Sequence, residues 1–195
     1  MQAKHHHPYQ AAIGWALLAL AVPLLWWVSH PTRQVLVEPQ LFVFFHTVVE
    51  LLAIVVALLV FVTGYYAMVS ARNGAVVLLG VSFLGVALLD FLHTMSYVGM
   101  PAAMTQNSPH KSIFFWLCAR LLAAVSLLAY SLLPNVSEIS RQRKRLTLAM
   151  MVGAVAALAY VGLFWPEKIP AFFVAGHGLT PLKIGMEWLI IGINL

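Results

Sequence analysis

The sequence predicts an all-α fold, a polytopic transmembrane helix bundle with about six spans. Of its 195 residues, 62% are hydrophobic and only 9% are charged, whereas soluble domains carry about 25% charged residues. The only cysteine, Cys118, lies in an apolar stretch, so a disulfide framework is excluded. These features indicate an integral membrane protein, for which we expect the lipid bilayer as a partner and no nucleic acid.

The apolar stretches give the number of spans. A membrane-spanning helix needs about 20 mainly apolar residues, and five complete candidates occur at 11–28, 41–69, 75–92, 113–133 and 146–165. A sixth begins near Leu182 and still continues at Leu195. We therefore divide the chain into an N-terminal cytoplasmic tail, 1–10, and a multi-helix membrane domain, 11–195. We expect that domain to be incomplete at its C-terminus and to belong to a longer protein.

Basic residues in the connections predict the orientation. Lys4, Arg72 and the segment 141–145, with its three arginines and one lysine, fall on one side of the predicted bundle. Arg33, Lys111 and Lys168 fall on the other. The positive-inside rule then places the N-terminus and a loop at 141–145 in the cytoplasm. The proline- and glycine-rich segment 166–181 would be an outward-facing turn region and not a helix.

Seven ionisable side chains lie in or at the edges of the apolar stretches. A charge at membrane depth costs roughly 2.5–3.5 kcal/mol on insertion scales, so it is rarely placed there without a partner or a function. Most of the seven occur in pairs separated by three or four residues, which places each pair on one helix face. The predicted topology brings all of them toward the outer side: His46, Glu50, Asp90, His93, Arg120, Lys183 and Glu187.

The residue types leave several functions open. Two imidazoles and two carboxylates, from His46, Glu50, Asp90 and His93, are ligands suited to zinc, iron, manganese or copper. Haem held by the two histidines is a further possibility. A nearby Arg120 favours instead an anionic ligand or a purely structural salt-bridge network. A histidine beside a carboxylate is also suited to sensing protons.

Several motifs together resemble the MASE3 family of bacterial membrane-associated sensor domains. They are Phe45-His46 followed by Glu50, the stretch from Leu88 to Tyr97 with Gly99-Met100, Ala119-Arg120, and the stretch from Gly176 to Lys183 leading to Glu187. The resemblance covers nearly all of the chain from about Leu41 onward. The family's domain continues through about two further helices, which are not in this sequence.

The resemblance implies a signal-input domain in the bacterial inner membrane. Such a domain precedes a cytoplasmic output, a histidine kinase of a two-component system or a diguanylate cyclase, and it is often dimeric. The sequence carries no catalytic motif, so we expect no enzyme activity from these residues. A transporter or channel is the main alternative, but we find no ionisable residues leading through the cytoplasmic halves of the helices, as a transport path would require.

Overall fold

The computed structural model describes residues 19–20, 23, 39–67, 73–102, 104–133 and 139–195. The chain divides into two compact units, 1–39 and 40–195, and almost all of the described residues belong to the second. The predicted first span, 11–28, and the predicted tail, 1–10, lie outside the described residues apart from positions 19, 20 and 23.

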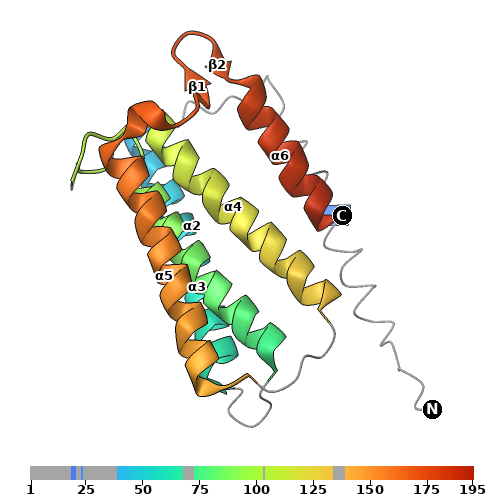
Figure 1. Ribbon diagram of the computed structural model, residues 1–195. Coiled ribbons are helices and arrows are strands. Elements are labelled where there is room, and N and C mark those ends of the chain that lie inside the picture. The colour runs from blue at the N-terminus through green and yellow to red at the C-terminus, as the bar shows by residue number, and fades with distance from the viewer. Residues whose placement is uncertain (1–18, 21–22, 24–38, 68–72, 103, 134–138) are drawn as a thin grey trace. The chain divides into compact units, whose positions relative to one another are not determined.

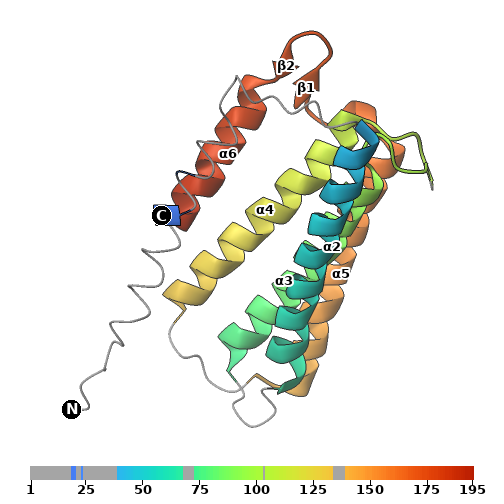
Figure 2. The ribbon, with the colours of Figure 1, turned by 180° about the vertical axis from the view of Figure 1, so that it is seen from behind.

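The second unit is a helix bundle with one small hairpin (Figure 1). Its elements are α2 (Pro39–Val62), the π-helical turn η2 (Thr63–Ala67), α3 (Gly74–Met95), α4 (Pro109–Leu132), α5 (Arg141–Phe164), the 3₁₀ turn η3 (Pro166–Lys168), strands β1 (Phe173–Val174) and β2 (Gly178–Leu179), and α6 (Pro181–Asn194). The strands pair antiparallel, with Phe173 opposite Leu179. The bundle end where the hairpin lies is called here the hairpin end. There α2, α4 and α6 begin and α3 and α5 end, and Figure 2 shows the course of α2 along the bundle.

Polar side chains fix the starts of four helices. Asn73, Ser108, Ser140 and Thr180 each accept a hydrogen bond from a backbone N–H in the first turn of the helix that follows. Such caps satisfy donors that have no partner within the helix. They also move the helix starts beyond the apolar stretches. The segment 141–145, expected to be a loop, is therefore the beginning of α5, capped by Ser140.

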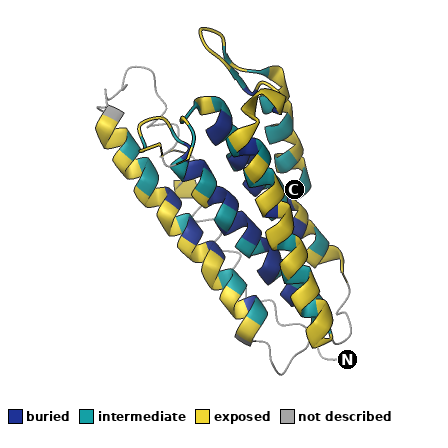
Figure 3. Ribbon diagram, turned by 60° about the vertical axis from the view of Figure 1, so that its left-hand side comes forward, coloured by how far each residue is buried: buried dark blue, intermediate teal, exposed yellow. Residues whose placement is uncertain are grey.

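Helix α3 is the centre of the bundle. It packs against α4, α5 and η2, and it carries more of the buried residues than any other described element (Figure 3). The apolar core around it includes Leu89 and Val86 of α3, Phe115 and Ala119 of α4, and Ile54 of α2. At the end opposite the hairpin, Gly64 and Gly80 allow η2 and α3 to approach closely, because a Cβ on Gly80 would lie 3.0 Å from the Cα of Gly64.

The expectation of about six spans is not supported. Four of the described helices are long and apolar enough to cross a membrane: Gln40–Tyr66, Gly74–Met95, Pro109–Leu132 and Arg141–Phe164. Helix α6, described over the 14 residues Pro181–Asn194, is not among these four candidates. The all-α bundle and four of the predicted spans are confirmed. Residues 166–180 form η3 and the hairpin, so no long helix occurs there, as expected.

Candidate functional site

Five of the seven ionisable residues meet inside the bundle, in the half nearer the hairpin end, which is called here the hairpin half. His46 and Glu50 come from α2, Asp90 and His93 from α3, and Arg120 from α4. We call this group the buried cluster. Within α2, His46 and Glu50 are one turn apart and therefore face the same neighbouring helix, as the spacing predicts. Glu50, Asp90 and His93 are buried, and the Arg120 side chain is one-third exposed.

Arg120 connects the two carboxylates. Its guanidinium nitrogen NH2 lies 3.7 Å from Oε2 of Glu50 and 3.6 Å from Oδ1 of Asp90. The other oxygen of Glu50, Oε1, lies 3.9 Å from Nε2 of His93. Glu50 therefore lies between a permanent cation on one side and an imidazole on the other.

Hydrogen bonds position His93 more firmly than any other residue of the cluster. Its Nδ1 lies 2.8 Å from the backbone carbonyl oxygen of Ser112 and 2.9 Å from the Ser112 hydroxyl. A carbonyl oxygen only accepts, so Nδ1 is assigned as the N–H donor. In the neutral imidazole, Nε2 then carries a lone pair directed toward Glu50.

Aromatic rings hold His46. Its ring stacks on Phe42 with centroids 5.9 Å apart, lies 4.6 Å from the ring of Tyr97, and meets the edge of His93 at 5.5 Å. These contacts orient the imidazole without using its nitrogens.

The cluster is incompletely satisfied. Among the described residues, four buried polar atoms have no hydrogen-bond partner: Nε2 of His46, Oε2 of Glu50, Oδ1 of Asp90 and Nε2 of His93. All four belong to this one group. Buried polar atoms are nearly always hydrogen-bonded, and such exceptions point to strain, function or a bound species.

The structure brings together three of the four residues expected as metal ligands. One ligand atom from each of His46, Glu50 and His93 lies within 4.8 Å of the other two. The fourth, Asp90, faces Arg120 instead. Its carboxylate is 1% exposed and serves to balance the guanidinium charge.

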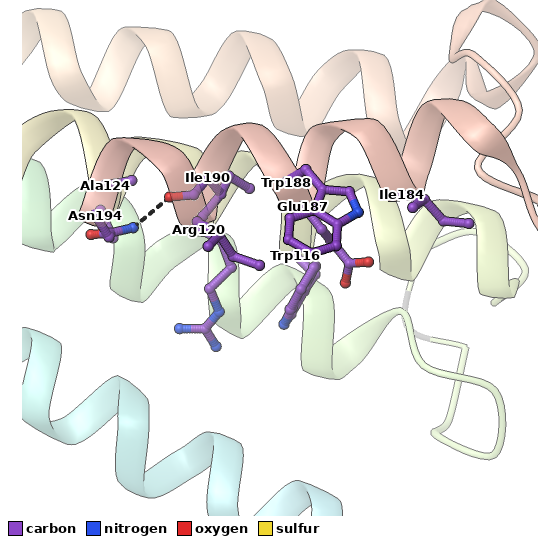
Figure 4. Close-up of a pocket in the computed structure, with 10 residues that line it drawn as sticks. Trp116, Arg120, Ala124, Ile184, Glu187, Trp188, Ile190 and Asn194 are labelled. Carbon is purple, nitrogen blue, oxygen red and sulfur yellow. Dashed lines mark hydrogen bonds between the residues drawn. The ribbon is translucent and has the colours of Figure 1, made fainter. Parts of the chain in front are cut away.

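Lys183 and Glu187 form a separate ion pair on α6, with Nζ and Oε1 2.5 Å apart. This pair and the buried cluster share a small cavity of about 210 Å³, whose walls include His46, His93, Trp116, Lys183 and Glu187. The cavity therefore joins α6 to the imidazoles of the cluster. A larger groove of about 530 Å³ runs between α4 and α6, mainly apolar but lined by Arg120, Glu187 and Asn194 (Figure 4).

Two contributors were not among the expected site residues. Ser112 fixes His93, and the Trp116 ring lies 5.8 Å from the Arg120 guanidinium carbon and 5.4 Å from Nζ of Lys183. Trp116 also lines both the cavity and the groove. Its spacing from Arg120, one helical turn, was the only sequence signal for this role.

Lys111 holds the connection between α3 and α4 in place. Although 2% exposed, its Nζ donates hydrogen bonds to the backbone oxygens of Thr105 and Gln106 and to the side chains of Thr105 and Asn107. Asn107 in turn donates to the carbonyl of Met100, whose sulfur accepts a hydrogen bond from Thr47 on α2. This connection therefore ties α2 to α3 beside the cluster.

Comparisons with known proteins identify the family. A family model described as a membrane-associated sensor domain, MASE3, matches residues 37–195. No curated protein and no solved structure matches the chain. The match covers every described helix from α2 to α6 and all seven ionisable residues. The chain therefore belongs to the MASE3 family of membrane-associated sensor domains.

Proposed function

We propose that this sensor domain receives its signal at the buried cluster and passes it on through α6 to a cytoplasmic output domain, a histidine kinase or a diguanylate cyclase. The signal would be a ligand, an ion or a proton. The observation that supports this most directly is the unsatisfied cluster of His46, Glu50, Asp90, His93 and Arg120.

Charge balance favours a positively charged signal. With both carboxyls ionised, Glu50 and Asp90 contribute two negative charges, and Arg120 contributes one positive charge. The buried group then has one negative charge in excess, because Lys183 and Glu187 neutralise each other. An unpaired charge is costly in a region of low dielectric. Uptake of a proton near the two imidazoles would neutralise this negative charge, and uptake of a divalent cation would replace it with a single positive charge.

Helix α6 is suited to respond. None of its residues is buried, and it packs against α4, with Met186 and Ile190 contacting a small core that contains Leu117 and Phe172. A helix held by so few buried contacts can shift at a modest free-energy cost. Since Lys183 and Glu187 line the same cavity as His46 and His93, a change of charge there would act on α6 directly.

The distribution of polar groups supports a sensor over a transporter. Among the described residues, the four buried ionisable side chains are Glu50, Asp90, His93 and Lys111, and all lie in the hairpin half. The rest of α3, back to Gly74, buries only Ser82 as a polar residue. A transport path requires polar groups that continue to the other side.

The test measures output activity of the full-length protein in membranes, over about pH 5 to 8 and with added divalent cations. We expect at least one of these conditions to change the output several-fold. Glu50→Gln keeps the side-chain volume but removes the charge, and it should abolish that response. Glu167→Gln, at an exposed position in η3, is the matched control and should respond normally. If Glu50→Gln responds as the unmodified protein does, the proposal is wrong.

A further inference from the structure

We infer that His46, Glu50 and His93 bind one divalent first-row transition-metal ion, of the zinc or ferrous type, through Nε2, a carboxylate oxygen and Nε2 respectively. The inference rests on the proposed sensing role of the buried cluster and names its ligand class. It is carried by the convergence of three ligand atoms within 4.8 Å of one another.

Both imidazoles offer the nitrogen that a metal needs. The Ser112 carbonyl holds the proton of His93 on Nδ1, which leaves Nε2 free to coordinate. A hydrogen bond from the second ring nitrogen to a carbonyl is the usual support of a metal-binding histidine. Nε2 of His46 is also buried and without a hydrogen bond, while the rings of Phe42 and Tyr97 hold its orientation.

The two oxygens of Glu50 have different neighbours. Oε2 lies toward Arg120 at 3.7 Å, and Oε1 lies toward Nε2 of His93 at 3.9 Å. The guanidinium therefore meets the carboxylate on the side away from His93. Asp90, 3.6 Å from Arg120, offsets the guanidinium charge, so that a dication is not repelled by an unbalanced neighbour.

The distances suit a small ion after a modest adjustment. Ligands at about 2.1 Å from a tetrahedral centre lie roughly 3.4 Å from each other. The present separations, up to 4.8 Å, require these ligand atoms to approach one another by up to about 1.4 Å around such an ion. Rotation of His46 can supply much of this, because its side chain lines the cavity and is only half-buried.

The donor set selects among cations. Two imidazoles and one carboxylate suit zinc and ferrous ions, whereas calcium and magnesium prefer oxygen ligands throughout. Three protein ligands leave a coordination position open. That position would face the cavity of about 210 Å³ lined by Lys183 and Glu187, so that an ion or its bound water would contact α6. The same geometry argues against haem, because the Glu50 carboxylate lies close to both imidazoles where the porphyrin would have to fit.

The test uses the full-length protein, purified without an affinity tag and with His5, His6 and His7 replaced by Gln, so that the N-terminal histidines cannot bind metal. After chelation, Co²⁺ is titrated in and its visible absorption recorded, and metal as purified is measured by mass spectrometry. We expect one Co²⁺ per chain with ligand-field bands of a four- or five-coordinate site. Glu50→Gln and His46→Ala should each weaken binding by at least about tenfold.

Two variants separate the coordinating role from a structural one. Asp90→Asn changes the cluster's charge but not the three ligands, so it should still bind one Co²⁺ with the same bands. His177→Ala, at an exposed hairpin histidine, should bind as the unmodified protein does. The inference is overturned if the unmodified protein binds no stoichiometric Co²⁺, or if Glu50→Gln and His46→Ala bind it with unchanged affinity.

The result also distinguishes the inference from the proposed function. If no metal binds but Glu50→Gln still abolishes the output response, the metal assignment fails and the sensing role of the cluster stands. If the metal binds as expected but neither the metal nor Glu50→Gln changes the activity of the output domain, the cluster is a metal site and the sensing role fails.

Discussion

At the scale of single residues, Arg120 determines how the buried cluster holds together. It is the one cation within 4 Å of Glu50 and of Asp90 among the described residues, at 3.7 and 3.6 Å. Without it, two carboxylates on α2 and α3 would face each other inside the bundle. Arg120 also lines the groove between α4 and α6 (Figure 4), so this side chain is in contact with the cluster on one side and with the groove beside α6 on the other.

We expect Arg120→Gln to lower the free energy of unfolding by about 2 kcal/mol. Breaking a fully buried ion pair costs roughly 3–5 kcal/mol, and the loss is smaller here because one-third of the Arg120 side chain is exposed. Thermal unfolding in detergent measures the change. Arg141→Gln, at an exposed position in the first turn of α5, should change stability by less than about 0.5 kcal/mol.

A double variant tests the reason for that loss. Asp90→Asn added to Arg120→Gln removes one of the two uncompensated carboxylates, so it should restore part of the stability. If the double variant is instead less stable by the sum of the two single effects, Arg120 does not act as the counter-charge of Asp90.

At the scale of elements, hydropathy predicts the helices well and their starts poorly. The apolar stretches 75–92 and 113–133 correspond to α3, Gly74–Met95, and α4, Pro109–Leu132. The first turns of α4 and α5 are polar, and the caps at Ser108 and Ser140 that define them contribute nothing to an apolar stretch. An apolar pattern therefore finds the part of a helix that lies in lipid, and the capping residues decide where the helix begins.

The pairing of helices also depends on small residues. Gly80 on α3 faces Gly64 in η2, and a Cβ added to Gly80 would lie 3.0 Å from the Gly64 Cα and 3.3 Å from the Phe61 carbonyl oxygen. Those neighbours are backbone atoms, which cannot rotate away. We expect Gly80→Ala to separate the two elements and to cost about 1–3 kcal/mol.

Gly153→Ala is the matched control for this contact. Gly153 is also within a membrane-spanning helix, α5, but a Cβ there would meet nothing within 4 Å. Alanine favours helix over glycine by about 0.5–1 kcal/mol, so this variant should be as stable as the unmodified protein or slightly more stable. Equal thermal midpoints for Gly80→Ala and Gly153→Ala would contradict the close contact between η2 and α3.

At the scale of the whole molecule, the sequence indicates which ionisable residues could form a site but not which of them are paired with one another. Spacing places His46 with Glu50 and Asp90 with His93 on common helix faces, and it places all of them near one end. It does not show that Asp90 lies toward Arg120 while Glu50 lies between Arg120 and His93. This pairing depends on how α2, α3 and α4 are rotated about their axes relative to one another. Side-chain packing around Phe115 and Leu89 determines that rotation.

Orientation in the membrane follows from the two ends of the bundle. Of the described residues, four basic ones in 141–145 lie at the end opposite the hairpin, whereas the hairpin end carries Lys111, Lys168 and Lys183. Lys111 and Lys183 are moreover engaged within the protein. The positive-inside rule then predicts that the hairpin end, and with it the buried cluster, faces outward. A signal from outside the cell would reach the cluster without crossing the bundle.

Labelling of single cysteines tests this orientation. In a Cys118→Ala background, Gln106→Cys and His177→Cys place a thiol at exposed positions of the hairpin end, and Gln142→Cys places one at the opposite end. A membrane-impermeant maleimide added to intact cells should label the first two and not the third. Inside-out vesicles should give the reverse. The same side for Gln106→Cys and Gln142→Cys would contradict α4 as a span, because an odd number of crossings separates these positions. Labelling of Gln142→Cys alone in intact cells would instead show that the domain has the opposite orientation, with the cluster near the cytoplasm and accessible to cytoplasmic ions.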